Sequence, residues 1–136
     1  MAPVGNPGEG RVERVPVKPR VVFLAGSYDS KDALKLVRDK INAIPKFRVQ
    51  ASWLDGDIGS EEEIAVKNLN EVGDADVFIL DTFLPSTTGG YHVELGAAFC
   101  TGAVTYRVGP VRNIYHRLTM HEVQDWESLY TRLKRW

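Results

Sequence analysis

The fold of this chain is decided by Ser86-Thr87-Thr88-Gly89-Gly90-Tyr91-His92-Val93-Glu94-Leu95-Gly96-Ala97-Ala98 and by the apolar run Val77-Phe78-Ile79-Leu80 before it. The apolar run is short and bulky and lies between Asp76 and Asp81, which is typical of a buried parallel strand. The polar, glycine-bearing loop predicts a connection, and the small and apolar residues after it predict a helix. Ligands of open α/β sheets bind at the carboxyl ends of the strands, so this loop is expected to face a ligand.

Strand and helix patterns alternate along the rest of the chain. Strands are expected at residues 20–25, 47–53, 76–80, 103–108 and 122–125, and helices at residues 31–43, 61–72, 91–101 and 126–136, with a helical turn at 113–118. Ser60 and Glu63 form a capping box before the second helix, and Gly73 stands where a helix-ending glycine is expected. The buried side of this helix is expected to carry Ala65, Leu69 and Val72. The alternation predicts an α/β three-layer sandwich with a five-stranded parallel sheet in the order 2-1-3-4-5.

The composition is typical of a single domain that acts on small molecules. The chain has 136 residues, a formal net charge of −1 and an isoelectric point near 6.3, so it lacks the electrostatic footprint of a protein that binds a nucleic-acid polymer. Cys100 is the only cysteine and is expected to pack within its helix rather than to react. No stretch has the length of a membrane span or the form of a secretory signal. We therefore expect a cytoplasmic protein that contacts no membrane.

The domain is expected to span residues 19–136. Residues 1–18 are rich in proline and glycine and poor in large apolar residues, a composition that cannot bury enough surface to offset its ordering entropy. We expect them to form a flexible tail.

Candidate site residues fall in the loops after two of the predicted strands. Gly26 permits a tight turn after the first strand, and Ser27 beside it can bind a ligand hydroxyl or phosphate. Gly89 and Gly90 let the backbone approach a bound sugar or phosphate closely. Glu94 follows near the first helical turn, where the helix dipole favours the ionised carboxylate that a nucleophile needs. The alternative is that Glu94 only stabilises the helix start, a common role for acidic residues there.

A metal site is not expected. The stretch Asp55-Gly56-Asp57-Ile58-Gly59 looks superficially like the start of a calcium loop. The ligand spacing and the terminal glutamate of an EF-hand do not follow it, so the stretch is interpreted as a plain turn.

Three segments together resemble the nucleoside 2-deoxyribosyltransferase family, which includes 2'-deoxynucleoside 5'-phosphate N-hydrolases. The segments are Val21–Ser27, Gly73–Leu80 and Gly89–Ala98, and the most specific part is the Gly-x-x-x-Glu-Leu-Gly-x-Ala core within the last of them. The resemblance extends from about Arg20 to the C-terminus. It implies an enzyme without a cofactor, in which Glu94 attacks the anomeric carbon of a nucleoside, the base leaves, and water or a second base takes the sugar.

The chain departs from this family at the residue that assists the leaving base. The family usually has an aspartate on the second helix, and the matching position here is Asn68. An amide can hydrogen-bond a base or a sugar hydroxyl but cannot donate a proton as a general acid. Asp81, at the carboxyl end of a predicted strand, is the preferred substitute.

The phosphate preference of the site is left open by the sequence. Phosphate-preferring members carry an arginine soon after the Gly-Ser turn, where this chain has Asp29. Ser86, Thr88 and the glycine amides can still bind a phosphate, and Arg107 is expected in or near the ligand face. Tyr28 is a candidate to stack on the base.

Two functional classes remain at this stage. One is an enzyme that cleaves or transfers at the N-glycosidic bond of a 2'-deoxynucleoside or its 5'-monophosphate. The other is a non-catalytic nucleotide-binding or sensing module, which Asn68 favours. Either is expected to be a homodimer or a larger homo-oligomer, because the C-terminal segment offers more apolar surface than a small sheet covers. The aromatic residues of that segment are Tyr115, Trp126, Tyr130 and Trp136.

Overall fold

One parallel sheet of five strands forms the centre of the fold, and its order β2-β1-β3-β4-β5 confirms the predicted order. The computed structural model describes residues 18–136, so residues 1–17 of the expected tail lie outside the described part. The strands are β1 (Arg20–Ala25), β2 (Phe47–Val49), β3 (Val77–Asp81), β4 (Val104–Val108) and β5 (His121–Val123). The helices are α1 (Lys31–Asn42), α2 (Glu61–Asp74), α3 (Gly90–Thr101) and α4 (Trp126–Lys134), with 3-10 helices η2 (Tyr28–Ser30), η3 (Ser52–Asp55) and η4 (Ile114–Leu118).

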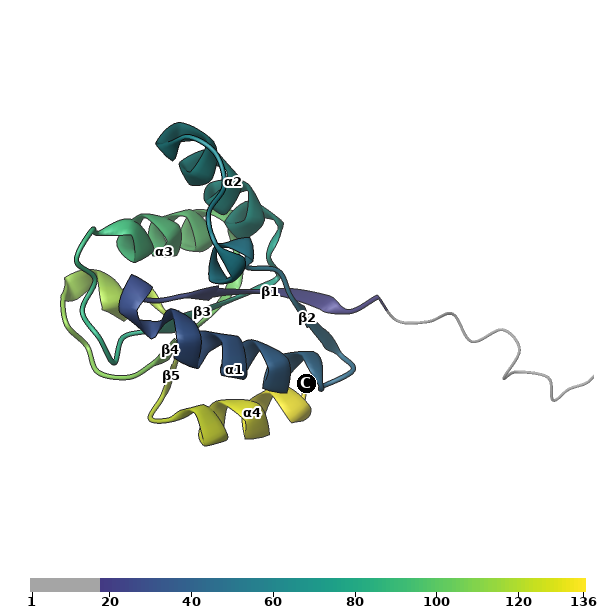
Figure 1. Cartoon of the computed structure of the whole chain (residues 1–136). Coiled ribbons are helices and arrows are strands. Elements are labelled where there is room, and N and C mark those ends of the chain that lie inside the picture. Colours follow the sequence, from purple (N-terminus) through teal and green to yellow (C-terminus); the bar gives the residue numbers. More distant parts are fainter. Residues whose placement is uncertain (1–17) are drawn as a thin grey trace, which may run out of the picture.

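Helices cover both faces of the sheet, as a three-layer sandwich requires. Figure 1 shows α1 and α4 on one face and α2 and α3 on the other, and these pairs of helices contact each other. In the middle of the sheet, Phe23 of β1 lies beside Phe78 of β3. Their stacked rings are 5.9 Å apart and have no exposed surface. Burial of apolar side chains at this centre supplies most of the favourable folding energy.

The carboxyl ends of β1, β3 and β4 meet at one edge of the sheet. Ala25 pairs with Leu80, and Asp81 pairs with Val108. At the opposite edge, a carboxylate oxygen of Asp76 accepts a hydrogen bond of 2.8 Å from the Val21 amide. The loops that follow β1, β3 and β4 are therefore brought together at the carboxyl edge, where ligands of such sheets bind.

The second strand is shorter than the sequence pattern predicts. The alternating apolar residues suggested a strand over residues 47–53, but β2 ends at Val49 and the chain turns into η3. The Ser52 amide donates to Glu71 at 3.0 Å, and the Trp53 indole donates to the Leu24 carbonyl at 2.8 Å. These hydrogen bonds occupy the Ser52 amide and the Leu24 carbonyl, which a longer β2 would need for pairing with β1. The strand therefore ends although the alternation of apolar residues continues in the sequence.

Helix α2 is more exposed than its apolar residues predict. The capping box is confirmed, since Ser60 and Glu63 exchange hydrogen bonds of 2.8 and 3.2 Å. However, Ala65 and Leu69 are exposed and Gly73 lies inside the helix rather than after it. Figure 1 shows α2 extending beyond the sheet. Only its C-terminal part is packed against the core, which leaves Val72 as the buried member of the predicted face.

Candidate active site

A cavity of about 140 Å³ opens at the carboxyl edge, between the loops that follow β1 and β3. It gathers most of the predicted site residues from four separate segments: Gly26, Tyr28, Asn68, Ser86, Thr88, Gly90 and Glu94. The other lining residues are Trp53, Asp57, Thr87 and Tyr91. Three predicted residues, Ser27, Gly89 and Asp81, are not part of this lining.

The loop after β1 forms one wall of the cavity. Gly26 is packed so closely that a Cβ there would lie 3.0 Å from the Leu34 side chain and 3.3 Å from the Asp81 Cβ. Ser27 is buried, and its hydroxyl accepts a hydrogen bond of 3.2 Å from the Asp29 amide. Ser27 therefore holds the turn. Tyr28 leaves 63% of its surface exposed and stands at the cavity opening, where a base could stack on its ring.

The loop before α3 forms the opposite wall, and its side chains bind its own backbone. The Ser86 hydroxyl accepts from the Gly89 amide at 2.9 Å, and the Thr88 hydroxyl accepts from the Gly90 amide at 3.3 Å. The Tyr91 hydroxyl accepts from the Ser86 amide at 3.2 Å. Gly89 has a φ of 79°, a left-handed conformation that favours glycine. The glycine amides expected to bind a phosphate thus already have partners within the loop.

Glu94 reaches the cavity from the second turn of α3, because the helix begins at Gly90 and its first turn holds no acidic residue. The prediction that the helix dipole keeps this carboxylate readily ionised is wrong. Burial of the side chain, together with the nearby carboxylates of Asp57 and Glu71, raises the pKa of Glu94 to about 7. Within residues 18–136, Glu94 makes no hydrogen bond or ion pair that would favour its charged form.

The third wall comes from η3 and α2 and contains residues that the sequence did not single out. Asn68 of α2 lines the cavity as predicted, whereas Asp57, interpreted from sequence as part of a plain turn, also lines it. The Trp53 ring completes this wall while its indole nitrogen binds the Leu24 carbonyl. The signal that could have pointed to Asp57 is its place in a loop following a strand of the sheet, where polar residues face the crevice.

Asp81 is buried at the end of β3, beneath Gly26. One of its carboxylate oxygens accepts a hydrogen bond of 2.8 Å from the Phe83 amide. Burial raises the pKa of Asp81, and this hydrogen bond opposes the rise. The carboxyl group therefore shapes the turn after β3 and does not line the cavity.

The arginines of the carboxyl edge bind the protein itself. Arg107, expected near the ligand face, is buried and donates to the Gly109 and His116 carbonyls at 3.1 Å and to Glu122 at 2.8 Å. Arg112 donates to the carbonyls of Thr82 and Phe83, both at 2.6 Å. Neither arginine lines the cavity.

A histidine pair anchors the start of α3 beside these arginines. His116 is fully buried, and its Nδ1 accepts from the Arg112 amide at 2.9 Å. Its Nε2 therefore carries the proton and faces the Nε2 of His92 at 3.3 Å. Asn113 also approaches this His92 nitrogen, at 2.6 Å. Burial lowers the pKa of His92 and lowers that of His116 to about 4, so both rings are neutral structural groups near neutral pH.

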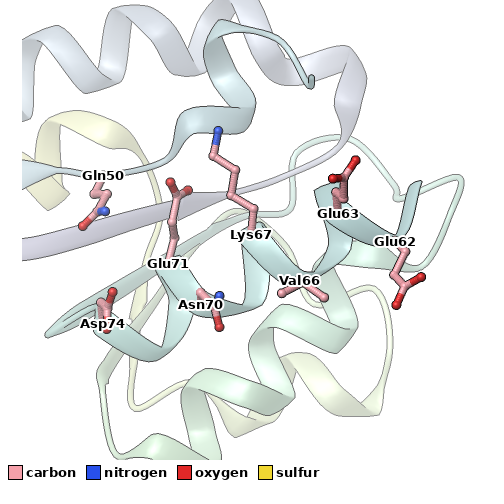
Figure 2. A pocket seen from close by; sticks show the side chains of 8 residues that line it. All are labelled: Gln50, Glu62, Glu63, Val66, Lys67, Asn70, Glu71 and Asp74. Atoms are coloured by element: carbon pink, nitrogen blue, oxygen red, sulfur yellow. The ribbon is translucent and has the colours of Figure 1, made fainter. Parts of the chain in front are cut away.

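A second cavity, of about 460 Å³, follows the exposed face of α2. Figure 2 shows its side chains arising mainly from this helix, with Gln50 from the loop after β2. Four carboxylates and Lys67 dominate the lining, and Glu71 among them already accepts from the Ser52 amide. None of the predicted site residues lies there, so we place the candidate site at the carboxyl edge.

Residues 18–136 contain no group of three or more His, Cys, Asp or Glu side chains that could hold a metal ion. In the same part of the chain, no helix is both long and apolar enough to cross a membrane.

Comparison with known proteins finds matches by structure but none by sequence. No protein-family model and no curated protein matches this chain. Solved structures with the same fold include a conserved protein from Enterococcus faecalis V583, with a TM-score of 0.72 and 14% identity over 87% of this chain and 99% of that one. A second is the Clostridium botulinum CMP N-glycosidase BcmB, with a TM-score of 0.59 and 18% identity over 86% and 100%. A third is the 2-deoxyribosyltransferase of Bacillus psychrosaccharolyticus, with a TM-score of 0.61 and 16% identity over 85% and 91%. At these identities the likeness establishes a shared fold.

Proposed function

We propose that this chain is an enzyme that cleaves or transfers at the N-glycosidic bond of a 2'-deoxynucleoside or its 5'-monophosphate, with Glu94 as the nucleophile. One observation carries this proposal: Glu94 lies in the carboxyl-edge cavity, beside a glycine loop, without a hydrogen-bond or ion-pair partner among residues 18–136. A half-buried carboxylate without a partner is costly to maintain, so such groups are concentrated at functional sites.

The shared fold supports this chemistry. Two of the solved neighbours are, by name, a CMP N-glycosidase and a 2-deoxyribosyltransferase, and both act at the bond between a base and a sugar. They support the resemblance of the sequence to the nucleoside 2-deoxyribosyltransferase family. Fold alone does not determine function, so the assignment depends on Glu94, Gly89 and Gly90 at the positions that this resemblance gives them.

The proposed reaction proceeds in two steps at one carbon. The ionised Glu94 attacks the anomeric carbon as the bond from that carbon to the base nitrogen breaks, and the bonding electron pair leaves with the base. This gives a covalent deoxyribosyl ester of Glu94. Water or a second base then attacks the same carbon and releases the glutamate. In this proposal the base stacks on Tyr28 at the cavity opening, and the Ser86–Gly90 loop contacts the sugar.

The proposal is tested by chromatography of purified protein with each natural 2'-deoxynucleoside and its 5'-monophosphate, with and without an acceptor base. We expect release of free base, or of a new nucleoside when the acceptor is present. Absence of both products from every substrate, with protein shown to be folded, would contradict the proposal.

A non-catalytic nucleotide-binding module is the second candidate. It is favoured by Asn68, because an amide at this position binds a ligand without donating a proton. Calorimetry distinguishes the two candidates: a sensing module binds a nucleoside or nucleotide that it returns unchanged, whereas the enzyme consumes it.

We also propose a homodimer or larger homo-oligomer, but through a different surface from the one first expected. Tyr130 is buried within the subunit, and Trp136 packs against Phe47 with ring centroids 5.4 Å apart. Tyr115 of the C-terminal segment is exposed. Among the other exposed apolar side chains, Val66, Leu69, Val93 and Phe99 lie on α2 and α3, two helices that cover the same face of the sheet (Figure 1). Light scattering should show more than one subunit at micromolar concentration, and Phe99→Asp should lower the mass.

Helix α3 also carries Cys100. The sequence suggests that this cysteine packs within the helix, but it is exposed. A lone exposed thiol is compatible with a reducing compartment. We therefore propose a cytoplasmic location, where nucleosides and nucleotides are metabolised.

A further inference from the structure

We infer that Asp57 is the proton donor to the leaving base, in place of the carboxyl group that is missing at position 68. The inference rests on the proposed function, because it assigns a second catalytic group to the same cavity. Asp57 and Glu94 are the two carboxyl-bearing residues of the cavity lining, and they reach it from different walls. Retaining glycosidic chemistry needs this arrangement, with one carboxylate as nucleophile and one carboxyl as acid.

Three other acidic residues near the cavity have protein partners. Asp81 accepts from the Phe83 amide and Glu71 accepts from the Ser52 amide. Asp55 pairs with Arg38 at 2.8 Å and does not line the cavity. Asp57 makes no hydrogen bond or ion pair with another residue of the described 18–136 segment, so its carboxyl remains available to a ligand.

The backbone around Asp57 is built to present it. Gly56 and Gly59 have φ angles of 105° and 111°, which side chains other than glycine rarely adopt. The chain can therefore turn sharply on both sides of Asp57, between the end of η3 and the start of α2. The negative charge of Asp57 is close enough to Glu94 to raise the pKa of that carboxyl.

The sharing of one proton between Asp57 and Glu94 suits this role. Two carboxyls without a cation in the lining favour a state in which one is ionised and the other is protonated, because two adjacent negative charges repel. At rest the shared proton lies on Glu94, whose pKa is raised to about 7, so in the proposed step it first moves to Asp57. Glu94 as the carboxylate then attacks the anomeric carbon while the Asp57 carboxyl donates the proton to the base, which takes the bonding pair. In the second step the Asp57 carboxylate accepts a proton from the attacking water as the Glu94 ester breaks. Both groups then return to their initial states.

The test compares single-turnover base release by wild type and Asp57→Asn across bases of different leaving ability. Two matched series are used: 5-substituted 2'-deoxyuridines from 5-nitro to 5-methyl, and 2'-deoxyguanosine against 7-methyl-2'-deoxyguanosine, whose base leaves without being protonated. We expect Asp57→Asn to lose about 10²–10⁴-fold on poor leaving bases and less than about 5-fold on the 5-nitro and 7-methyl substrates.

Two further variants control the experiment. Asp55→Asn removes a carboxylate from the same stretch but outside the cavity, and should change neither series by more than about 3-fold, since its ion pair is largely exposed. Asp57→Asn combined with Asn68→Asp places a carboxyl on the α2 wall, and should restore part of the rate on poor leaving bases.

The inference is overturned if Asp57→Asn loses the same factor on every substrate, or loses nothing. A lower midpoint of the pH–rate profile with an unchanged dependence on the leaving base would show that Asp57 acts only through its charge on Glu94, and would also overturn it. If wild type releases no base from any substrate, the proposed function itself fails.

Discussion

The two halves of the sheet's carboxyl edge differ in whether their polar side chains have partners. Beside β4 and β5, Arg107, Arg112 and His116 are bound to backbone carbonyls, a backbone amide or another side chain. Beside β1 and β3, Glu94 and Asp57 line a cavity without a partner in the described chain. Polar groups of the first kind stabilise the loops, whereas groups of the second kind are retained at a cost in stability and indicate function.

The largest effect is expected from Glu94→Gln in the cavity half. An amide cannot form the glycosyl ester, so turnover should fall by about 10³-fold or more, while binding of the nucleoside is retained. Base release by chromatography and ligand binding by calorimetry measure the two quantities. Glu61→Gln, a charge change at an exposed position on α2, is the matched control. Turnover by Glu94→Gln close to that of wild type would remove Glu94 from the mechanism.

The partnered half should respond in stability instead. Arg107→Met removes the buried guanidinium that donates to the Gly109 and His116 carbonyls and to Glu122 and should lower the free energy of unfolding by about 2–4 kcal/mol. Arg38→Met removes a largely exposed pair with Asp55 and should cost less than about 1 kcal/mol. Urea denaturation measures both values. Equal losses for the two variants would mean that burial of Arg107 adds nothing.

In the cavity half, the contribution of Glu94 to the free energy of unfolding should depend on pH. Because the pKa of Glu94 is raised to about 7, the folded protein binds a proton more tightly than the unfolded chain. Stability should therefore fall as pH rises from about 4.5 to 7. Glu94→Gln should be more stable than wild type by about 1–3 kcal/mol near pH 8 and equal to it near pH 4. Wild-type turnover of 7-methyl-2'-deoxyguanosine, whose base leaves without being protonated, should rise over the interval around pH 7, as the Glu94 carboxylate forms. Thermal unfolding and rate measurements across pH test both; a stability difference that is the same at both pH values would contradict the raised pKa.

A smaller effect is expected on the choice between nucleoside and nucleotide. The cavity lining contains no lysine or arginine, and both arginines of the edge are bound elsewhere. The charges of Asp57 and Glu94 should therefore disfavour a 5'-phosphate, and we expect about 10-fold higher kcat/KM for a 2'-deoxynucleoside than for its monophosphate. Lys31, whose ammonium lies 4.9 Å from the Tyr28 ring centroid, is the cation to examine. A preference for the monophosphate that Lys31→Met abolishes would contradict this expectation.

The sequence predicts well those features that depend on neighbouring residues. The strand order, the bounds of β1 and the capping box at Ser60 follow from periodicity and local hydrogen bonding, and the structure confirms them. The topology also brings the carboxyl ends of β1 and β3 to one edge, so Gly26 and Gly90 line the same cavity.

The features that the sequence could not give depend on distant partners. Trp53 leaves the strand pattern because its indole binds a carbonyl of β1. The pKa of Glu94 depends on carboxylates from α2 and from the loop before it. The sequence pattern predicts that Asp57 is an ordinary turn residue, and only the fold brings it into the cavity that Glu94 also lines. In each case the deciding contact joins residues that no local pattern relates.

Trp53 gives the cavity an optical signal of its own. Its ring lines the site while its indole nitrogen is held by the Leu24 carbonyl, and the other two of the three tryptophans, Trp126 and Trp136, lie in the C-terminal segment. In a protein with Trp126→Phe and Trp136→Phe, all tryptophan emission would come from the cavity wall. Occupancy by a nucleoside that stacks near this ring would quench that emission, so binding could be followed in real time without a labelled ligand.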